Sequence, residues 1–206
     1  GEMNSYALYA DKYFEDHSGM FFLDYDGYGT GGEWQQKKKH RYLTYGMKDW
    51  LLGLEYRRRS DSWLNAVVLE YVYSKYQSGP IYHDHTKTIA DHIGGNDNYY
   101  NHYIYPGYQH WGQAMGNPFY RSPVYNKDGK IEFADNRFVA YHLGLAGTPN
   151  EYVNWRMLAS WQKGLGTYTE PYSKERSNMS LLAEITYKPH SISVSWLNGV
   201  DIKAAY

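Results

Sequence analysis

Large apolar side chains recur at every second position in two neighbouring stretches of the chain. The first stretch, residues 49–59, places four of them on one face: Trp50, Leu52, Leu54 and Tyr56. The second stretch, residues 63–75, repeats the pattern: Val67, Leu69, Tyr71 and Tyr73. Only the turn Ser60–Ser62 separates them. A two-residue period belongs to a β-strand whose two faces meet different surroundings, so this region predicts an antiparallel hairpin of long strands.

The same period returns in the last third of the chain and predicts three more strands. The first of them has this apolar set: Val139, Tyr141, Leu143 and Leu145. A turn predicted at Gly147–Asn150 leads to the second set: Val153, Trp155, Met157, Ala159 and Trp161. The third set follows later: Leu181, Ala183, Ile185 and Tyr187. A turn at Lys188–His190 then leads into a final predicted strand from Ile192 to Ile202.

The other face of these strands and the connections between them favour a membrane barrel. Charged residues occupy that second face: Glu55, Arg57, Glu70, Arg156 and Glu184. The predicted strands exceed the ~5–6 residues typical of soluble sheets and approach the ~9–11 that cross a bilayer. Short turns alternate with two long polar segments, Gln77 to about Tyr108 and Gly164 to about Ser177. The pattern therefore predicts an all-β, antiparallel outer-membrane β-barrel whose charged face lines a water-filled lumen.

A soluble antiparallel sandwich with one wet face is the alternative that the same alternation allows. A helical membrane protein is excluded, because no apolar run approaches the ~20 residues that a membrane helix needs. The chain opens with GEMNSYALYADKYF, which is too polar for the apolar region of a signal peptide. We expect either a mature form or a chain whose upstream portion is missing.

Composition changes this interpretation mainly through the aromatic residues. Of 206 residues 25 are Tyr and 7 are Trp, and such rings suit sugar sites, protein interfaces and membrane–water boundaries. Rings at predicted strand ends fit an interfacial girdle: Trp50, Trp63, Tyr73, Trp161 and Tyr187. The net charge of −1 argues against nucleic acid as a partner. The absence of Cys excludes disulfides and thiolate metal sites.

The stretch DHIGGNDNYYNHYIYPGYQHWGQ, residues 91–113, mixes rings with Asn, Asp and His and has no apolar period. Aromatic rings stack on the C–H faces of sugars while polar side chains bind the hydroxyls, so this mixture favours a saccharide site. The candidate stacking residues are Tyr99, Tyr100, Tyr103, Tyr105, Tyr108 and Trp111. The candidate hydrogen-bonding residues are Asp97, Asn98, Asn101 and His102, with Arg121 as a contact for an acidic sugar. Alternatively, the tyrosines fold this loop back into the lumen as a plug.

Three other motifs have simpler explanations than the sites they suggest. GYGTGG, residues 27–32, matches the dinucleotide-binding G-x-G-x-x-G, but no apolar helical stripe follows, which favours a flexible turn. HDH, residues 83–85, lies near Asp91–His92 without a recognised ligand spacing, so we expect solvated loop residues, with no metal or cofactor. KKKHR, residues 37–41, is expected to be a solvated loop, with contact to an acidic glycan or lipid head group as the alternative.

Four segments resemble the capsule assembly Wzi family, in particular its Bacteroidetes-type branch: WLNAVVLEYVYSKYQSGPIYHDHT, DHIGGNDNYYNHYIYPGYQHWGQAMGNPFYRSP, NRFVAYHLGLAG and RMLASWQKGLGTYTEPYSKERSNMSLLAEITY. The resemblance extends from about Phe14 to the C-terminus, and GGNDNYYN and WGQAMGNPFYRSP are its most specific parts. It implies an outer-membrane β-barrel of roughly eighteen strands in a Gram-negative bacterium. Such a protein acts as a lectin that retains capsular or other surface polysaccharide, and it is not an enzyme.

Only about eight or nine strands can be drawn in this chain, so it corresponds to the C-terminal portion of such a barrel. Residues 1–206 would then form a single β-barrel portion with no second domain. A half barrel has two unpaired edges and would associate, aggregate or be a fragment. The expected partners are surface polysaccharide and outer-membrane lipid. Three rival functions remain: a porin or transport barrel, a soluble β-sheet carbohydrate-binding protein, and a barrel enzyme that pairs carboxylates such as Glu70 and Glu184.

Overall fold

A computed structural model describes most of the chain: residues 4–13, 48–77, 82–84, 92–94, 96–188 and 202–205. Within these ranges the chain forms β-strands and one short 3-10 turn, and it contains no α-helix. None of the described segments forms a helix that could span a membrane.

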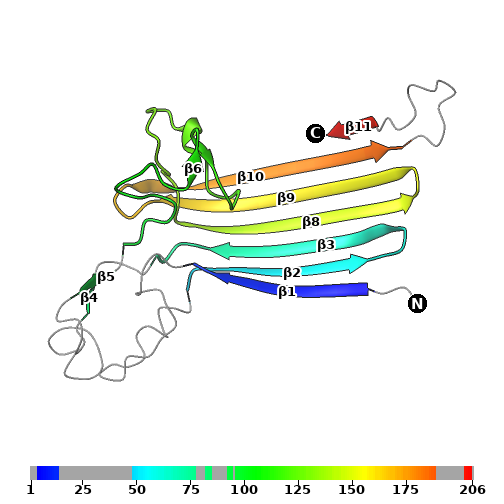
Figure 1. The fold of residues 1–206 in the computed structure, drawn as a ribbon, viewed down its shortest axis with the longest axis horizontal. Coiled ribbons are helices and arrows are strands. Elements are labelled where there is room, and N and C mark those ends of the chain that lie inside the picture. Colours follow the sequence, from blue (N-terminus) through cyan, green and yellow to red (C-terminus); the bar gives the residue numbers. More distant parts are fainter. Residues whose placement is uncertain are drawn as a thin grey trace.

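The main element is a single sheet of seven strands (Figure 1). Its strands, in spatial order, are β1 (Asn4–Lys12), β2 (Trp50–Arg58), β3 (Ser62–Tyr73), β8 (Phe138–Asn150), β9 (Val153–Gly166), β10 (Pro171–Tyr187) and β11 (Ile202–Ala205). All neighbouring strands are antiparallel. The predicted all-β antiparallel class is therefore confirmed. Within the described part of the chain, β1 and β11 are the edge strands and no pairing closes the sheet.

The predicted hairpin of residues 49–75 is confirmed as β2 and β3, but the next predicted turn is wrong. Strand β8 continues through Gly147 to Asn150, and the chain turns at residues 151–152 instead. Gly147 is small for a packing reason, because the backbone oxygen of Trp63 and the indole of Trp155 lie where its Cβ would be. The same indole donates from Nε1 to the backbone oxygen of Trp63 at 2.8 Å. Close packing, and not a turn, therefore requires glycine at this position.

The predicted long polar loop from Gly164 to about Ser177 is also wrong. Strand β9 runs to Gly166 and β10 begins at Pro171, so the connection is confined to residues 167–170. Residues 173–180 are exposed throughout, which hides the period that identifies a strand. Cross-strand contacts stabilise this polar stretch, including an ion pair between Lys163 and Glu175. The predicted turn at residues 188–190 and the strand from Ile192 lie mostly outside the described residues.

The two faces of the sheet differ as the two-residue period predicts. Partners across six strands form an apolar row: Leu8, Leu54, Leu69, Leu143, Ala159 and Leu181. The next row lies on the opposite face: Tyr9, Gly53, Glu70, His142, Ser160 and Ser180. We call these the apolar face and the polar face. The apolar face is uncovered, since Leu8 is 83% and Leu181 66% exposed.

The segment between β3 and β8 forms a lobe at one end of the sheet (Figure 1). We call residues 96–137 the loop lobe; it contains β6 (Gln109–His110), β7 (Gln113–Ala114) and the 3-10 turn η2 (Pro123–Tyr125). Strands β4 (Tyr82–Asp84) and β5 (His92–Gly94) pair separately. Aromatic residues of the lobe and the start of β8 pack on Val72 and Ala140 of the polar face: Tyr99, Tyr120, Phe133 and Phe138.

A buried carboxylate attaches the loop lobe to the end of the sheet. Asp49 is 2% exposed and accepts hydrogen bonds from the backbone N–H groups of Tyr76 (2.9 Å) and Gln77 (2.7 Å). It also accepts from the hydroxyl of Tyr99 at 3.2 Å. Burial raises the pKa of Asp49, and the two backbone donors oppose that rise. The side-chain amide of Gln77 continues the network by donating to the backbone oxygen of Asn136 at 2.7 Å.

Replacing this carboxylate should destabilise the fold. Asp49→Ala leaves two backbone N–H groups without their acceptor, so we expect the free energy of unfolding to fall by about 2 kcal/mol in a urea titration. Asp61→Ala is the matched control, because Asp61 is exposed in the turn between β2 and β3. It should change the free energy by no more than about 0.5 kcal/mol. Equal effects of the two substitutions would contradict the anchoring role.

Candidate functional site

The structure divides the predicted sugar-binding residues into two groups. The framework group is buried or half-buried: Asp97, Asn98, Tyr99, Tyr100 and Asn101. The surface group is exposed: His102, Tyr103, Tyr105, Tyr108, Trp111 and Arg121. All eleven belong to the loop lobe. Their contact with sugar stays a prediction.

The tyrosines of the framework group build the core of the lobe. The ring of Tyr100 stacks on Tyr120 with centroids 3.6 Å apart, and Phe133 meets it edge-on at 5.2 Å. The Tyr100 hydroxyl accepts the backbone N–H of Asn117 at 2.9 Å. Tyr99 is only 7% exposed, and burial raises the pKa of both tyrosines. These rings therefore support the lobe, with Tyr99 enclosed in the interior.

The polar residues of the framework group hydrogen-bond within the lobe and to Gln77 at the end of the sheet. Asn101 brackets the backbone of Phe133: its amide donates to the carbonyl at 2.9 Å, and its oxygen accepts the N–H at 2.8 Å. The side-chain oxygen of Asn98 accepts from Asn101 at 2.9 Å and from Asn136 at 2.6 Å. Asp97 is 6% exposed, and its backbone N–H donates to Gln77 at 3.0 Å. Satisfying buried polar groups in this way makes the lobe a defined structure.

The surface group includes an exposed stack of three rings. His102 lies against Tyr103 and Tyr105, with centroid distances of 4.9 and 4.2 Å and interplanar angles of 19° and 18°. Its Nδ1 accepts the backbone N–H of Ile104 at 3.1 Å, which fixes the imidazole orientation. Tyr103 is 92% exposed. Large rings held flat against one another and open to solvent are a suitable stacking surface for a sugar.

Trp111 occupies the tip of the β6–β7 hairpin in an unfavourable backbone conformation. Its φ is +54° and that of Gly112 is +75°, as a two-residue type I′ turn requires. Asn or Asp normally fills the first of these positions, and a bulky residue there costs about 1–2 kcal/mol. The indole is nevertheless 86% exposed. Backbone strain that holds a large apolar ring in solvent is an indication of a functional residue.

Arg121 is one of the positive charges near Asp135, a carboxylate whose pKa is raised. Burial raises the pKa of Asp135 to about 6. The backbone N–H groups of Gly166 and Leu165 oppose this rise, followed by the positive charges of Arg176 and Arg121. Asp135 fits closely against Gly164, where a side chain would collide with the carboxylate. The Arg121 guanidinium is exposed and donates to the backbone oxygen of Tyr125 at 2.6 Å.

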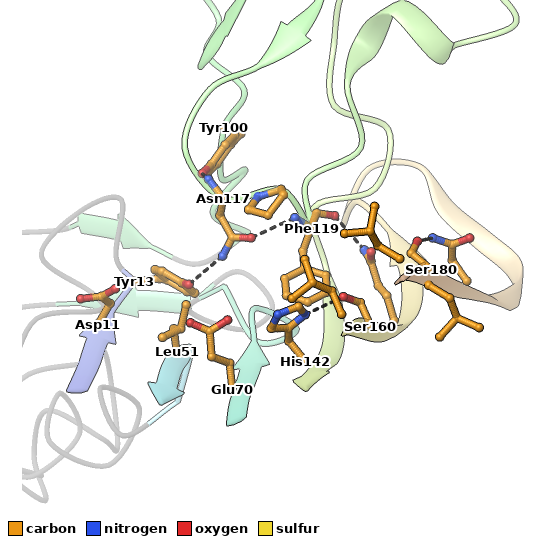
Figure 2. Close-up of a pocket in the computed structure, with 16 residues that line it drawn as sticks. Asp11, Tyr13, Leu51, Glu70, Tyr100, Asn117, Phe119, His142, Ser160 and Ser180 are labelled. Atoms are coloured by element: carbon orange, nitrogen blue, oxygen red, sulfur yellow. Dashed lines mark hydrogen bonds between the residues drawn. The ribbon is translucent and has the colours of Figure 1, made fainter. Parts of the chain in front are cut away.

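A groove of about 700 Å³ lies between the polar face and the loop lobe (Figure 2). Its sheet side includes Glu70, His142, Ser160 and Gln162, and its lobe side includes Asn117 and Phe119. Oε1 of Glu70 accepts the Tyr9 hydroxyl at 2.6 Å, and Nδ1 of His142 lies 2.7 Å from Oγ of Ser160. The Gln162 amide donates to the backbone oxygen of Phe119 at 3.0 Å. The groove is thus a concave surface with ordered polar groups, separate from the exposed rings.

Sequence patterns did not identify these groove residues as one site. The two-residue period places Glu70, His142 and Ser160 on the polar face of three different strands. Their adjacency depends on register, because Glu70 faces His142 and His142 faces Ser160 across the strand pairs. Alternation shows which face a residue occupies but not which residue lies beside it on the next strand.

Among the described residues, no three His, Asp or Glu side chains converge on a point that could hold a metal ion. The histidine-rich motif is only partly described, since His85 and Asp91 lie outside those residues. The glycine-rich and basic segments at residues 27–32 and 37–41 also lie outside them.

Comparisons of the chain with protein-family models, curated proteins and solved structures gave no match. The resemblance to the Wzi family therefore stays a prediction that rests on the four quoted segments.

The raised pKa of Asp135 predicts a pH-dependent stability. Because the folded pKa of about 6 exceeds the ordinary value of 3.8, the folded state holds this proton more tightly than the unfolded state. The favourable contribution of neutral Asp135 is present below about pH 4 and is lost as the pH rises through about 6. Asp135→Asn stays neutral, so the stability of this variant relative to the wild type should increase over that interval.

The measurement is the free energy of unfolding of both proteins at pH 4, 5, 6 and 7. Asp128→Asn is the control, because Asp128 is exposed and 4.0 Å from Lys130. A difference between Asp135→Asn and wild type that is the same at pH 4 and pH 7 would contradict the assigned pKa.

Proposed function

We propose that this chain is part of an outer-membrane β-barrel that binds surface polysaccharide through its loop lobe, in a Gram-negative bacterium. One observation carries the proposal: a sheet with a continuous exposed apolar face also holds a lobe of exposed rings at one end. The apolar face would contact lipid, the polar face would line the interior, and the lobe would meet the glycan. No catalytic step is assigned to the chain.

The apolar face supports the membrane part of the proposal. Soluble monomers rarely expose apolar patches larger than a few hundred Å², whereas this face extends over six neighbouring strands. Lipid acyl chains are a surrounding in which such a face is stable, provided that the backbone groups are paired within the sheet. The lengths of β3, β8 and β9 are 12, 13 and 14 residues, enough for the ~9–11 residues that cross a bilayer.

The positions of the connections support an orientation for the lobe. The segments between β1 and β2 and between β3 and β8 are long, and both leave the sheet at the end that holds the loop lobe. The turns at residues 59–61 and 151–152 lie at the opposite end, while one short connection, at residues 167–170, lies at the lobe end. Outer-membrane barrels place long loops outside the cell and short turns in the periplasm. The lobe would therefore face the capsule.

The surface group supports the choice of polysaccharide as the ligand. Tyr103, Tyr105 and Trp111 are exposed rings, and the imidazole of His102 adds a polar group beside Tyr103 and Tyr105. Arg121 is a further exposed polar residue of the lobe. The resemblance to the Wzi family points to the same ligand class and to a larger barrel in which this chain is the C-terminal portion. A soluble carbohydrate-binding sheet is less well supported, because large side chains such as Leu8 and Leu181 would remain in water.

The test is a triple substitution of the exposed rings. Tyr103→Ala, Tyr105→Ala and Trp111→Ala together should weaken retention of polysaccharide purified from the surface of the producing cells by about tenfold or more, because stacking on three rings is lost. Retention can be measured on immobilised, detergent-refolded protein. Tyr99 and Tyr100 are left intact, since their removal would disrupt the core of the lobe.

Two controls separate loss of binding from loss of structure. Trp63→Ala removes a ring that is 76% exposed at the start of β3, the end of that strand away from the lobe, and it should leave retention unchanged. Trp111→Asn relieves the left-handed strain, so it should weaken retention without lowering thermal stability. Full retention by a folded triple variant would remove these rings from the site.

A further inference from the structure

We propose that the groove between the polar face and the loop lobe is a second saccharide site that prefers sugar units with a free amine to units with a carboxylate. The inference rests on the proposed function in taking a glycan as the ligand. It concerns different residues, on the sheet rather than on the outer surface of the lobe. It also adds a charge preference that the exposed rings do not have.

The shape of the groove suits a short stretch of a sugar chain. Its volume of about 700 Å³ lies within the ~300–1,000 Å³ of small-ligand sites. In Figure 2, Glu70 and His142 occupy the sheet side, and Asn117 and Phe119 face them from the lobe. The rings of Phe119 and Tyr13 offer apolar surface beside these polar groups. Sugar sites combine surfaces of these two kinds.

The charges that line the groove determine which sugars it favours. Among the described residues, the lining includes the carboxylates of Asp11 and Glu70 and no Lys or Arg. Among the described residues, Glu70 accepts a hydrogen bond from the neutral hydroxyl of Tyr9, at 2.6 Å. A ligand amine would therefore meet uncompensated negative charge, while a ligand carboxylate would be repelled.

Glu184, a second carboxylate on the polar face, differs from Glu70 because cations neutralise its charge. Glu184 lies 2.9 Å from a guanidinium nitrogen of Arg156 and 2.8 Å from the ammonium of Lys203. Two cations thus neutralise Glu184, and none of the described residues does so for Glu70. The contrast places the negative potential of the polar face at the groove, next to the loop lobe.

The Glu70 carboxylate is held in position before any ligand binds. Tyr9, Gly53 and Glu70 are consecutive partners on three adjacent strands. The ring of Tyr9 lies across Gly53, occupying the space that a side chain there would need. Because Gly53 has no side chain, the Tyr9 hydroxyl can reach Glu70. A carboxylate oriented in this way requires little reorganisation when a ligand amine approaches.

The strands beyond Glu70 provide groups for sugar hydroxyls. His142 and Ser160 form a hydrogen-bonded pair at 2.7 Å, and Ser160 faces Ser180 on the next strand. Imidazole and hydroxyl groups can donate or accept hydrogen bonds, as sugar hydroxyls do. These polar side chains extend the groove away from Glu70, so more than one sugar unit can bind.

The experiment compares three oligosaccharides of equal length at pH 6 by calorimetric titration of the detergent-refolded chain. They are glucosamine oligomers with free amines, the same oligomers N-acetylated, and galacturonic acid oligomers. We expect affinity to fall in that order, with about tenfold or more between the first and the last. Glu70→Gln should weaken only the free-amine oligomer, by about three- to tenfold, because the groove is partly open to solvent.

Glu70→Gln retains an oxygen that can accept the Tyr9 hydroxyl, so this variant should fold. Glu132→Gln is the matched control, because Glu132 pairs with Lys130 at 3.3 Å on the lobe and does not line the groove. It should change none of the three affinities. Equal binding of the amine and acid oligomers, no oligomer binding at all, or an amine preference that Glu70→Gln does not reduce would overturn the groove proposal.

The outcomes also separate this inference from the proposed function. A variant lacking Tyr103, Tyr105 and Trp111 side chains should keep the amine preference while losing polysaccharide retention. Loss of retention in that variant, together with no effect of Glu70→Gln, would leave the lobe as the glycan site and remove the groove. Normal retention in that variant, together with an amine preference that depends on Glu70, would overturn the lobe site and support the groove.

Discussion

Cross-strand register is the constraint on which the rest of the structure depends. Side chains alternate between faces along a strand, so a slip of one residue would move a whole strand's apolar set to the other side. With the observed pairing, Leu54, Leu69 and Leu143 align on one face, and Glu70 and His142 align on the other. One alignment thus produces both an exposed apolar face and a polar face. The two proposed roles of the chain follow from the same set of backbone hydrogen bonds.

The loop lobe depends on the end of the sheet and in turn shapes the groove. Asp49 and Asn136 satisfy buried polar groups where the lobe meets the strands, and Val72 and Ala140 provide the apolar surface beneath its rings. Inner rings such as Tyr99 fill the lobe, which leaves outer rings such as Tyr103 in solvent. Because the lobe covers only one end of the polar face, a groove remains beside it. A rigid lobe is what allows exposed rings to keep a fixed arrangement.

The sequence predicted the strands whose faces have different surroundings and missed features that depend on packing. Residues 50–58 and 62–73 alternate clearly and were placed correctly. Gly147 was misjudged, because only the structure shows the Trp155 indole above it. The start of β10 has polar residues on both faces and therefore no detectable period. Composition located the sugar-binding candidates in one loop, but it could not tell an inward ring such as Tyr99 from an outward one such as Tyr103. The groove could not be predicted without the register, because its residues come from different strands.

The most direct test of the central claim is a lipid-contact scan along β9, a strand paired on both sides. The chain has no Cys, so a fluorophore on a single introduced Cys reports one position at a time. In vesicles with brominated acyl chains, quenching should alternate with a period of two. It should be strong at 157, 159 and 161 on the apolar face and weak at 158, 160 and 162 on the polar face. Uniform quenching along the strand, or none, would contradict a sheet with one face in lipid and one in a polar interior.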